Sequence, residues 1–78
     1  MNNKQKYDQV FKTAFNVSDE QLPALVYQGI EAWDSVGHMG LIAELEEAFD
    51  MMFDTDDIID FSSYEKGKEL LKKYNVET

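Results

Sequence analysis

The sequence predicts an all-α fold, a small bundle of three main helices and one short helix. Three observations support this expectation. Apolar residues recur at helical spacing in three segments, no segment alternates apolar and polar residues as a strand would, and 78 residues have room for one modest core. Residues 1–78 are therefore expected to form a single domain.

The first helix is expected near the N-terminus, with Asn2 or Asn3 as its cap. Its apolar residues fit the template i, i+3, i+4, i+7, i+8: Tyr7, Val10, Phe11, Ala14 and Phe15. Residues 16–34 break this pattern with Ser18, Pro23 and Gly29, yet they stay rich in apolar side chains. We expect a long connection that packs across the helices.

The central helix is expected from Ser35 to about Met52. Its core side carries Leu41, Ile42, Leu45, Ala48, Phe49 and Met52. When the central helix is projected at about 100° per residue, a small apolar strip falls on a face away from the core side, and carboxylates border this strip. The strip consists of Val36, Met39 and Ala43, and the bordering acids are Glu44, Glu46, Glu47 and Asp50. Two interpretations stay open: the strip packs against the long connection, or it docks a partner.

The C-terminal third predicts one short and one longer helix. Residues 54–60 give one or two turns around Ile58 and Ile59, and a last helix follows to about Asn75. Ser62 and Glu65 have the spacing of a capping box for that helix. An EF-hand calcium loop starting at Asp54 fails, because isoleucine stands where an acidic ligand and the glycine of the turn are needed. We therefore expect no metal site.

Charge and composition narrow the classes of partner. With 16 acidic and 7 basic residues, the net charge is -9, which opposes binding to nucleic acid or to anionic membranes. The sequence has no cysteine, so it supplies neither a disulfide nor a thiol nucleophile. The sequence has neither the apolar core of a signal peptide nor an apolar run of membrane-spanning length, so a cytoplasmic location is expected. Nothing in the distribution of apolar residues demands more than a monomer.

Ser35, at the expected start of the central helix, is the main candidate for chemistry. Taken alone, Asp34 and Ser35 are most simply helix caps. A phosphodiester on Ser35 would also suit this place, because free backbone N–H groups and the helix dipole stabilise an anion. A Ser35 and His38 hydrolase dyad is the weakest interpretation, since no nucleophile-elbow motif surrounds the serine, and a partly buried structural histidine is expected instead.

Taken together, these features resemble the acyl carrier and peptidyl carrier proteins. The resemblance covers nearly the whole chain and rests on the acidity, the helix order and the Asp34, Ser35, Val36 step, followed by LEEAF at residues 45–49. Valine follows the serine here where leucine is usual, and Gly37 and Gly40 depart from typical fatty-acid carriers. The resemblance leaves fatty-acid synthesis open as the pathway, and these departures suggest a specialised carrier, for lipid synthesis, surface-polysaccharide modification or secondary metabolism.

The resemblance implies a non-enzymatic carrier. Ser35 would hold a covalent 4'-phosphopantetheine arm, attached from coenzyme A by a phosphopantetheinyl transferase with the help of Asp34. The arm's thiol would hold acyl or aminoacyl groups as thioesters for acyl-activating or synthase enzymes with basic docking faces. The implied docking residues are Val36, Met39, Glu44 and Glu47, and the implied lining of the acyl cavity is Leu45, Ile58 and Ile59.

The alternative from another functional class is an acidic helical interaction module in which Ser35 is only a helix cap.

Overall fold

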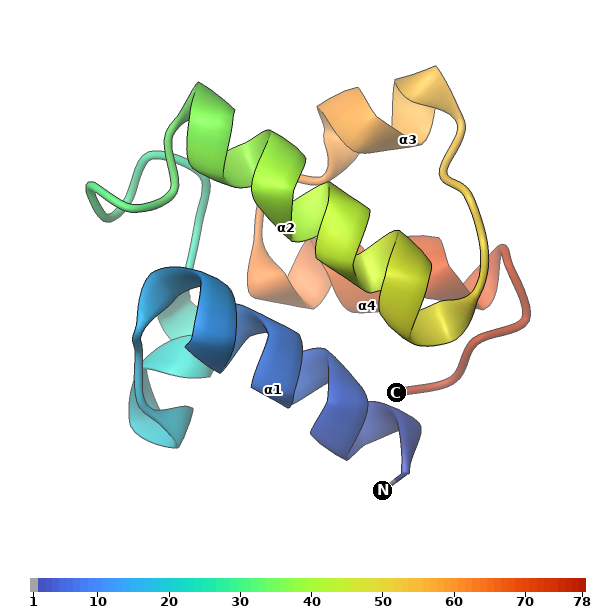
Figure 1. The fold of residues 1–78 in the computed structure, drawn as a ribbon, viewed down its shortest axis with the longest axis horizontal. Coiled ribbons are helices and arrows are strands. Elements are labelled where there is room, and N and C mark those ends of the chain that lie inside the picture. Colours follow the sequence, from blue (N-terminus) through green and yellow to red (C-terminus); the bar gives the residue numbers. More distant parts are fainter. Residues whose placement is uncertain (1) are drawn as a thin grey trace.

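Apolar stripes on separate segments of the chain fold into helices that pack around one core. The computed structural model describes residues 2–78, and in these residues it contains five helices and a single isolated β-bridge between Val26 and Ser63. The helices are α1 (Asn3–Phe15), η1 (Asp19–Ala24), α2 (Ser35–Phe49), α3 (Thr55–Asp60) and α4 (Tyr64–Lys72) (Figure 1). The predicted all-α fold, with three main helices and one short one, is confirmed, and η1 is an addition. Within residues 2–78, no helix has both the length and the apolar character needed to cross a membrane.

α1 has well-defined ends. The Asn2 side chain accepts a hydrogen bond from the Gln5 backbone N–H at 2.8 Å, and the Gln5 side chain accepts one from the Asn2 N–H at 3.1 Å. This reciprocal capping box selects Asn2 from the two predicted caps. The helix ends where Asn16 takes a left-handed conformation, with φ of 55°.

The long connection packs across the bundle, as expected, and contains a 3-10 helix that the sequence did not predict. η1 includes Pro23 and buries Leu22. After it, the backbone pairs with the segment before α4: the Tyr27 N–H donates to the Ser62 carbonyl, and the Tyr64 N–H donates to the Leu25 carbonyl. The long connection therefore leads into α2 and is also hydrogen-bonded to the segment between α3 and α4.

α2 ends three residues earlier than predicted. Asp50 adopts φ of 51°, a left-handed conformation that stops the helix after Phe49. Glu46 then accepts a hydrogen bond from the Phe53 N–H at 3.0 Å, so its carboxylate supports the turn after the helix and does not border the exposed strip. Met52, predicted to face the core, lies beyond the helix end and is 79% exposed.

The start of α4 differs from its predicted position by one residue. Ser63, not Ser62, is the cap, because its hydroxyl accepts the hydrogen bond from the Lys66 N–H. The helix ends at Lys72, and tight turns continue the chain to Asn75, which again has a positive φ. The α-helix is thus shorter than the apolar spacing predicted.

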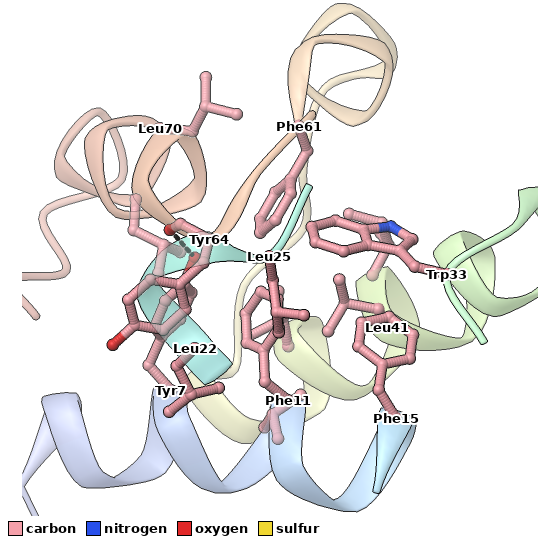
Figure 2. Packing of buried hydrophobic residues seen from close by; sticks show 14 of the residues in the cluster. Tyr7, Phe11, Phe15, Leu22, Leu25, Trp33, Leu41, Phe61, Tyr64 and Leu70 are labelled. Carbon is pink, nitrogen blue, oxygen red and sulfur yellow. Dashed lines mark hydrogen bonds between the residues drawn. The ribbon is translucent and has the colours of Figure 1, made fainter. Parts of the chain in front are cut away.

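The core contains several aromatic rings that pack against one another. Figure 2 shows rings from α1, from the long connection and from the segment after α3 gathered between the helices. The Trp33 ring stacks on Phe15 at 5.2 Å and meets Phe11 edge-on at 5.6 Å, measured between ring centroids. Phe61 lies on the other side of Trp33 at 6.3 Å. Such contacts add to the free energy gained from apolar burial and fill the middle of the bundle with side chains.

Candidate functional site

Ser35 is the exposed first residue of α2, and its neighbour Asp34 caps the helix. Asp34 has extended backbone angles, with φ of −100°, so its carboxylate turns back and accepts a hydrogen bond from the Gly37 N–H at 2.8 Å. The interpretation of Ser35 as the helix cap is therefore wrong, because Asp34 has that role. The Ser35 side chain is exposed at the N-terminal end of a fifteen-residue helix.

Gly37 allows the chain to turn into α2 at this point. A Cβ atom on Gly37 would lie 2.0 Å from the Ala32 carbonyl oxygen, far inside van der Waals contact. Before this turn, Gln28 has φ of 64°, and its N–H donates to the Trp33 carbonyl at 2.8 Å. A tight loop thus brings Trp33 into the core one residue before the cap.

A pocket of about 350 Å³ lies directly beside Ser35. Its walls come from α2, from α3, and from the paired segments around residues 27 and 62. Most of the lining is apolar or aromatic, and the full set is Tyr27, Ser35, His38, Met39, Ile58, Ile59, Phe61 and Ser62. The volume is at the lower end of the range of about 300–1,000 Å³ that is typical of small-molecule sites.

The pocket brings together some of the predicted site residues and excludes one. Ser35, Met39, Ile58 and Ile59 all line it. Leu45 does not, because it lies fully buried among the core side chains. The pocket beside Ser35 therefore does not include Leu45, and a role of Leu45 in lining an acyl cavity stays a prediction.

Met39 and Ile59 line the pocket and are exposed, and Val36, which follows Ser35 in α2, is exposed but does not line it. Val36 is 80% exposed, Met39 55% and Ile59 73%. The exposed strip is therefore not covered by the long connection. Ile59 was also expected to help close the core, and its exposure shows that Ile58 and Phe61 do so without it.

The two predicted docking carboxylates lie on a different flank of α2. Glu44 and Glu47 are exposed and border a shallow hollow shared with Val10 of α1 and with Ala48. The predicted docking surface thus has two parts, an apolar part next to Ser35 and an acidic part facing α1.

His38 forms hydrogen bonds through both ring nitrogens. Trp33 Nε1 donates to His38 Nδ1 at 2.9 Å, and His38 Nε2 lies 2.8 Å from the Ile58 carbonyl oxygen. Because an indole N–H only donates and a carbonyl only accepts, these contacts require the neutral ring with its proton on Nε2. The half-buried, structural histidine that the sequence predicted is confirmed, and neither nitrogen bonds to Ser35.

α3 is held to the C-terminal turn by a polar cluster. Lys73 Nζ lies 2.6 Å from Asp57 Oδ1, the Tyr74 hydroxyl donates to Asp57 Oδ2, and the Asp54 N–H donates to the Tyr74 oxygen at 2.9 Å. The hydrogen bond from Lys73, with that from Tyr74, lowers the pKa of Asp57 below its usual range. Among residues 2–78, no three side chains of the metal-binding types are grouped as a metal site.

Sequence reasoning did not predict four of the eight pocket residues as part of a site: Tyr27, His38, Phe61 and Ser62. Phe61 and Ser62 lie far from Ser35 along the chain, and the backbone pairing of residues 25–27 with residues 62–64 brings Tyr27 and Ser62 together at the pocket. An isolated two-residue pairing leaves no periodic pattern in the sequence. Comparisons with models of protein families, with curated proteins and with solved structures found no match.

Proposed function

We propose that the protein is a non-enzymatic carrier whose Ser35 holds a 4'-phosphopantetheine arm, on which acyl or aminoacyl groups travel as thioesters. The observation that carries the proposal is the position of Ser35: an exposed hydroxyl at the first residue of α2 and at the edge of an apolar pocket. A covalent arm needs an accessible attachment atom, and its cargo needs an apolar surface within reach.

The residues around Ser35 suit a phosphodiester. In the attachment step, Ser35 Oγ bonds to the pantetheine-linked phosphorus of coenzyme A, adenosine 3',5'-bisphosphate leaves with the electron pair, and the hydroxyl proton passes to solvent. The product is an anion near the positive end of the α2 dipole, where it is stabilised. The arm ends in a thiol, which supplies the sulfur that this cysteine-free chain lacks.

The remaining predicted residues have separate roles in this proposal. Val36 and Met39 offer apolar contacts to partner enzymes, and Glu44 and Glu47 attract their basic docking faces. Partners are the phosphopantetheinyl transferase and the acyl-activating or synthase enzymes, and the carrier acts as a cytoplasmic monomer. A hydrolase that uses His38 as base is disfavoured, because both ring nitrogens bond elsewhere.

The test is intact mass spectrometry after incubation with coenzyme A, magnesium and a broad-specificity phosphopantetheinyl transferase. Three proteins are compared: the parent, Ser35→Ala, and Ser62→Ala as the matched control, because Ser62 is an exposed serine of the same pocket. We expect one added arm on the parent and on Ser62→Ala, and none on Ser35→Ala.

An unmodified parent protein would support the second candidate function, an acidic helical interaction module. Val36, Met39 and Ile59 are exposed apolar side chains on an acidic protein, which an interaction module would also need. If the parent stays unmodified while a known carrier in the same tube gains the arm, the carrier proposal fails and the result favours the acidic interaction module.

A further inference from the structure

We propose that Trp33 and His38 form a hydrogen-bonded staple across the start of α2, and that this staple positions Ser35 for the transfer of phosphopantetheine from coenzyme A. The inference rests on the proposed carrier function and names a residue that the transfer depends on. His38 is a positioning residue, because it acts through the backbone of the helical turn that carries Ser35.

His38 is the residue through which the first turn of α2 reaches the core. Ser35 is exposed, Val36 is 80% exposed, and Gly37 has no side chain. The next buried side chain of the helix is Leu41, which lies almost one turn beyond His38. The contacts of the His38 ring therefore decide whether the turn that carries Ser35 is fastened to the rest of the protein.

The local sequence makes this turn weak. Gly37 occupies the third helical position, where α1 has the Gln5 side chain of its capping box, so the start of α2 lacks the second hydrogen bond of such a box. Glycine is also a poor helix former, and both Gly37 and Gly40 lie in the first two turns of α2. The turn that carries Ser35 thus needs support from outside the helix.

Trp33 and His38 have the spacing of a helix staple. Trp33 directly precedes the cap Asp34, and His38 is the fourth residue of the helix, the two positions at which apolar side chains form a hydrophobic staple. Here a hydrogen bond joins the two rings, because Trp33 Nε1 donates to His38 Nδ1 at 2.9 Å. The rings are nearly parallel, with an angle of 17° and 6.2 Å between centroids. The backbone N–H of His38 also donates to the Asp34 carbonyl at 2.8 Å, so both the main chain and the side chain close this turn.

Trp33 is a firm anchor for the staple because the core encloses it. Its side chain has no exposed surface, stacks on Phe15 of α1 and meets Phe61 at 6.3 Å between centroids (Figure 2). Breaking the bond to His38 would leave the indole N–H buried without an acceptor, which is costly. The buried indole thereby holds the ring of His38, and with it the first turn of α2, in one place.

Two substitutions separate the staple from the other hydrogen bond of His38, which joins Nε2 to the Ile58 carbonyl of α3. In His38→Asn, the amide oxygen can take the place of Nδ1 and accept from Trp33, whereas the bond to Ile58 is lost. In His38→Gln, the amide nitrogen can take the place of Nε2 and donate to Ile58, whereas the acceptor for Trp33 is lost. Glutamine is the better helix former, so an effect of helix propensity alone would favour His38→Gln.

The experiment measures kcat and KM of a broad-specificity phosphopantetheinyl transferase with the parent and both variants as substrates. Amide hydrogen exchange of residues 37–40 is followed in the same proteins before loading. His38→Gln should lower kcat about tenfold, because a loosened turn presents Ser35 in the wrong position. KM should change little, since the proposed docking acids Glu44 and Glu47 lie further along α2. Exchange at residues 37–40 should be faster in this variant.

His38→Asn should keep most of the kcat of the parent and the slow exchange, although it loses the bond to α3. Trp33→Phe removes the donor of the staple and leaves an aromatic ring in the core, so it should lower kcat as His38→Gln does. The double variant of Trp33→Phe and His38→Gln should be no slower than either single variant, because both changes remove the same hydrogen bond.

Equal kcat values for the parent and His38→Gln would overturn the proposal. So would a His38→Asn that is as slow as His38→Gln, because the two variants would then act through a general loss of stability. If His38→Gln does not fold, as judged by circular dichroism, Trp33→Phe provides the comparison.

The carrier function and the staple fail in different ways. A parent that accepts no arm, beside a known carrier that does, refutes the carrier function and with it any role of the staple in the transfer. A parent that is loaded at the same rate as every variant refutes the role of the staple alone.

Discussion

Asp34 and Ser35 have different roles at the start of α2, although either residue type is a good helix cap. The extended backbone of Asp34 places its carboxylate on the Gly37 N–H, and Ser35 follows as the first helical residue with an exposed side chain. The serine is thereby available for modification without any cost to helix capping.

This division predicts that alanine substitutions at Asp34 and Ser35 differ in their effect on stability. Asp34→Ala should lower the free energy of unfolding by about 1 kcal/mol, because the cap hydrogen bond is lost. Ser35→Ala should change it by less than about 0.5 kcal/mol, because the side chain is exposed. Urea denaturation of the two variants and the parent measures this, and equal destabilisation would contradict the assignment of the cap.

The two glycines of α2 give a second prediction at the residue scale. Gly40 has open space around it, so Gly40→Ala should stabilise the protein by up to about 1 kcal/mol through helix propensity. Gly37→Ala should destabilise it in spite of the same propensity, because its Cβ would overlap the Ala32 carbonyl. Thermal unfolding of both variants provides the measurement, and a stabilised Gly37→Ala would show that the turn before α2 differs from the one described.

At the scale of the element, α3 depends on its contacts with the rest of the protein. Six residues are too few for a stable isolated helix, and Asp54 makes no side-chain cap hydrogen bond. The helix is held at Asp57 by Lys73 and Tyr74, at the Ile58 carbonyl by His38, and at its end by the buried Phe61. A few side-chain contacts thus hold α3 in place, and α3 forms one wall of the pocket beside Ser35.

The Asp57 cluster predicts a pH dependence of stability. Hydrogen bonds from Lys73 and then Tyr74 lower the pKa of Asp57, so its contribution is complete above the ordinary carboxyl pKa of about 3.9 and is lost as the pH falls through the lower, folded-state value. The same ion pair raises the pKa of Lys73, so on the alkaline side the contribution is lost only as the pH rises through that raised value.

Asp57→Asn should therefore be less stable than the parent at neutral pH, and this difference should shrink as the pH falls below about 4. Chemical denaturation at a series of pH values measures the difference. A gap that stays constant into acid would mean that the carboxylate charge does not hold α3.

At the scale of the whole molecule, the net charge of -9 should speed association with basic partners. Glu44→Gln with Glu47→Gln should raise the KM of the transferase and weaken its dependence on salt, with little effect on kcat. Glu20→Gln with Glu77→Gln, two exposed acids outside α2, is the control with the same change in charge. Equal effects of both pairs would show that net charge, and not the α2 surface, guides the partner.

Much of the architecture follows from local sequence, whereas the pocket does not. Apolar spacing predicted α1, α2 and α4, because each of these helices buries a stripe of its own residues. The short α3 was predicted from Ile58 and Ile59, although its one buried residue is Asp57. Sequence reasoning missed η1, whose proline and short length give no periodic signal, and it placed one cap a residue early. The family resemblance, and not helical spacing, assigned Leu45 to the acyl cavity; in the structure Leu45 belongs to the buried core and not to the lining of the pocket beside Ser35.

The most direct measurement is peptide-level mass spectrometry of the protein purified from its native cells. The account predicts that the peptide containing Ser35 carries one 4'-phosphopantetheine, with or without an acyl group on its thiol. An unmodified Ser35, in an extract whose other carrier proteins do carry the arm, would contradict the central claim.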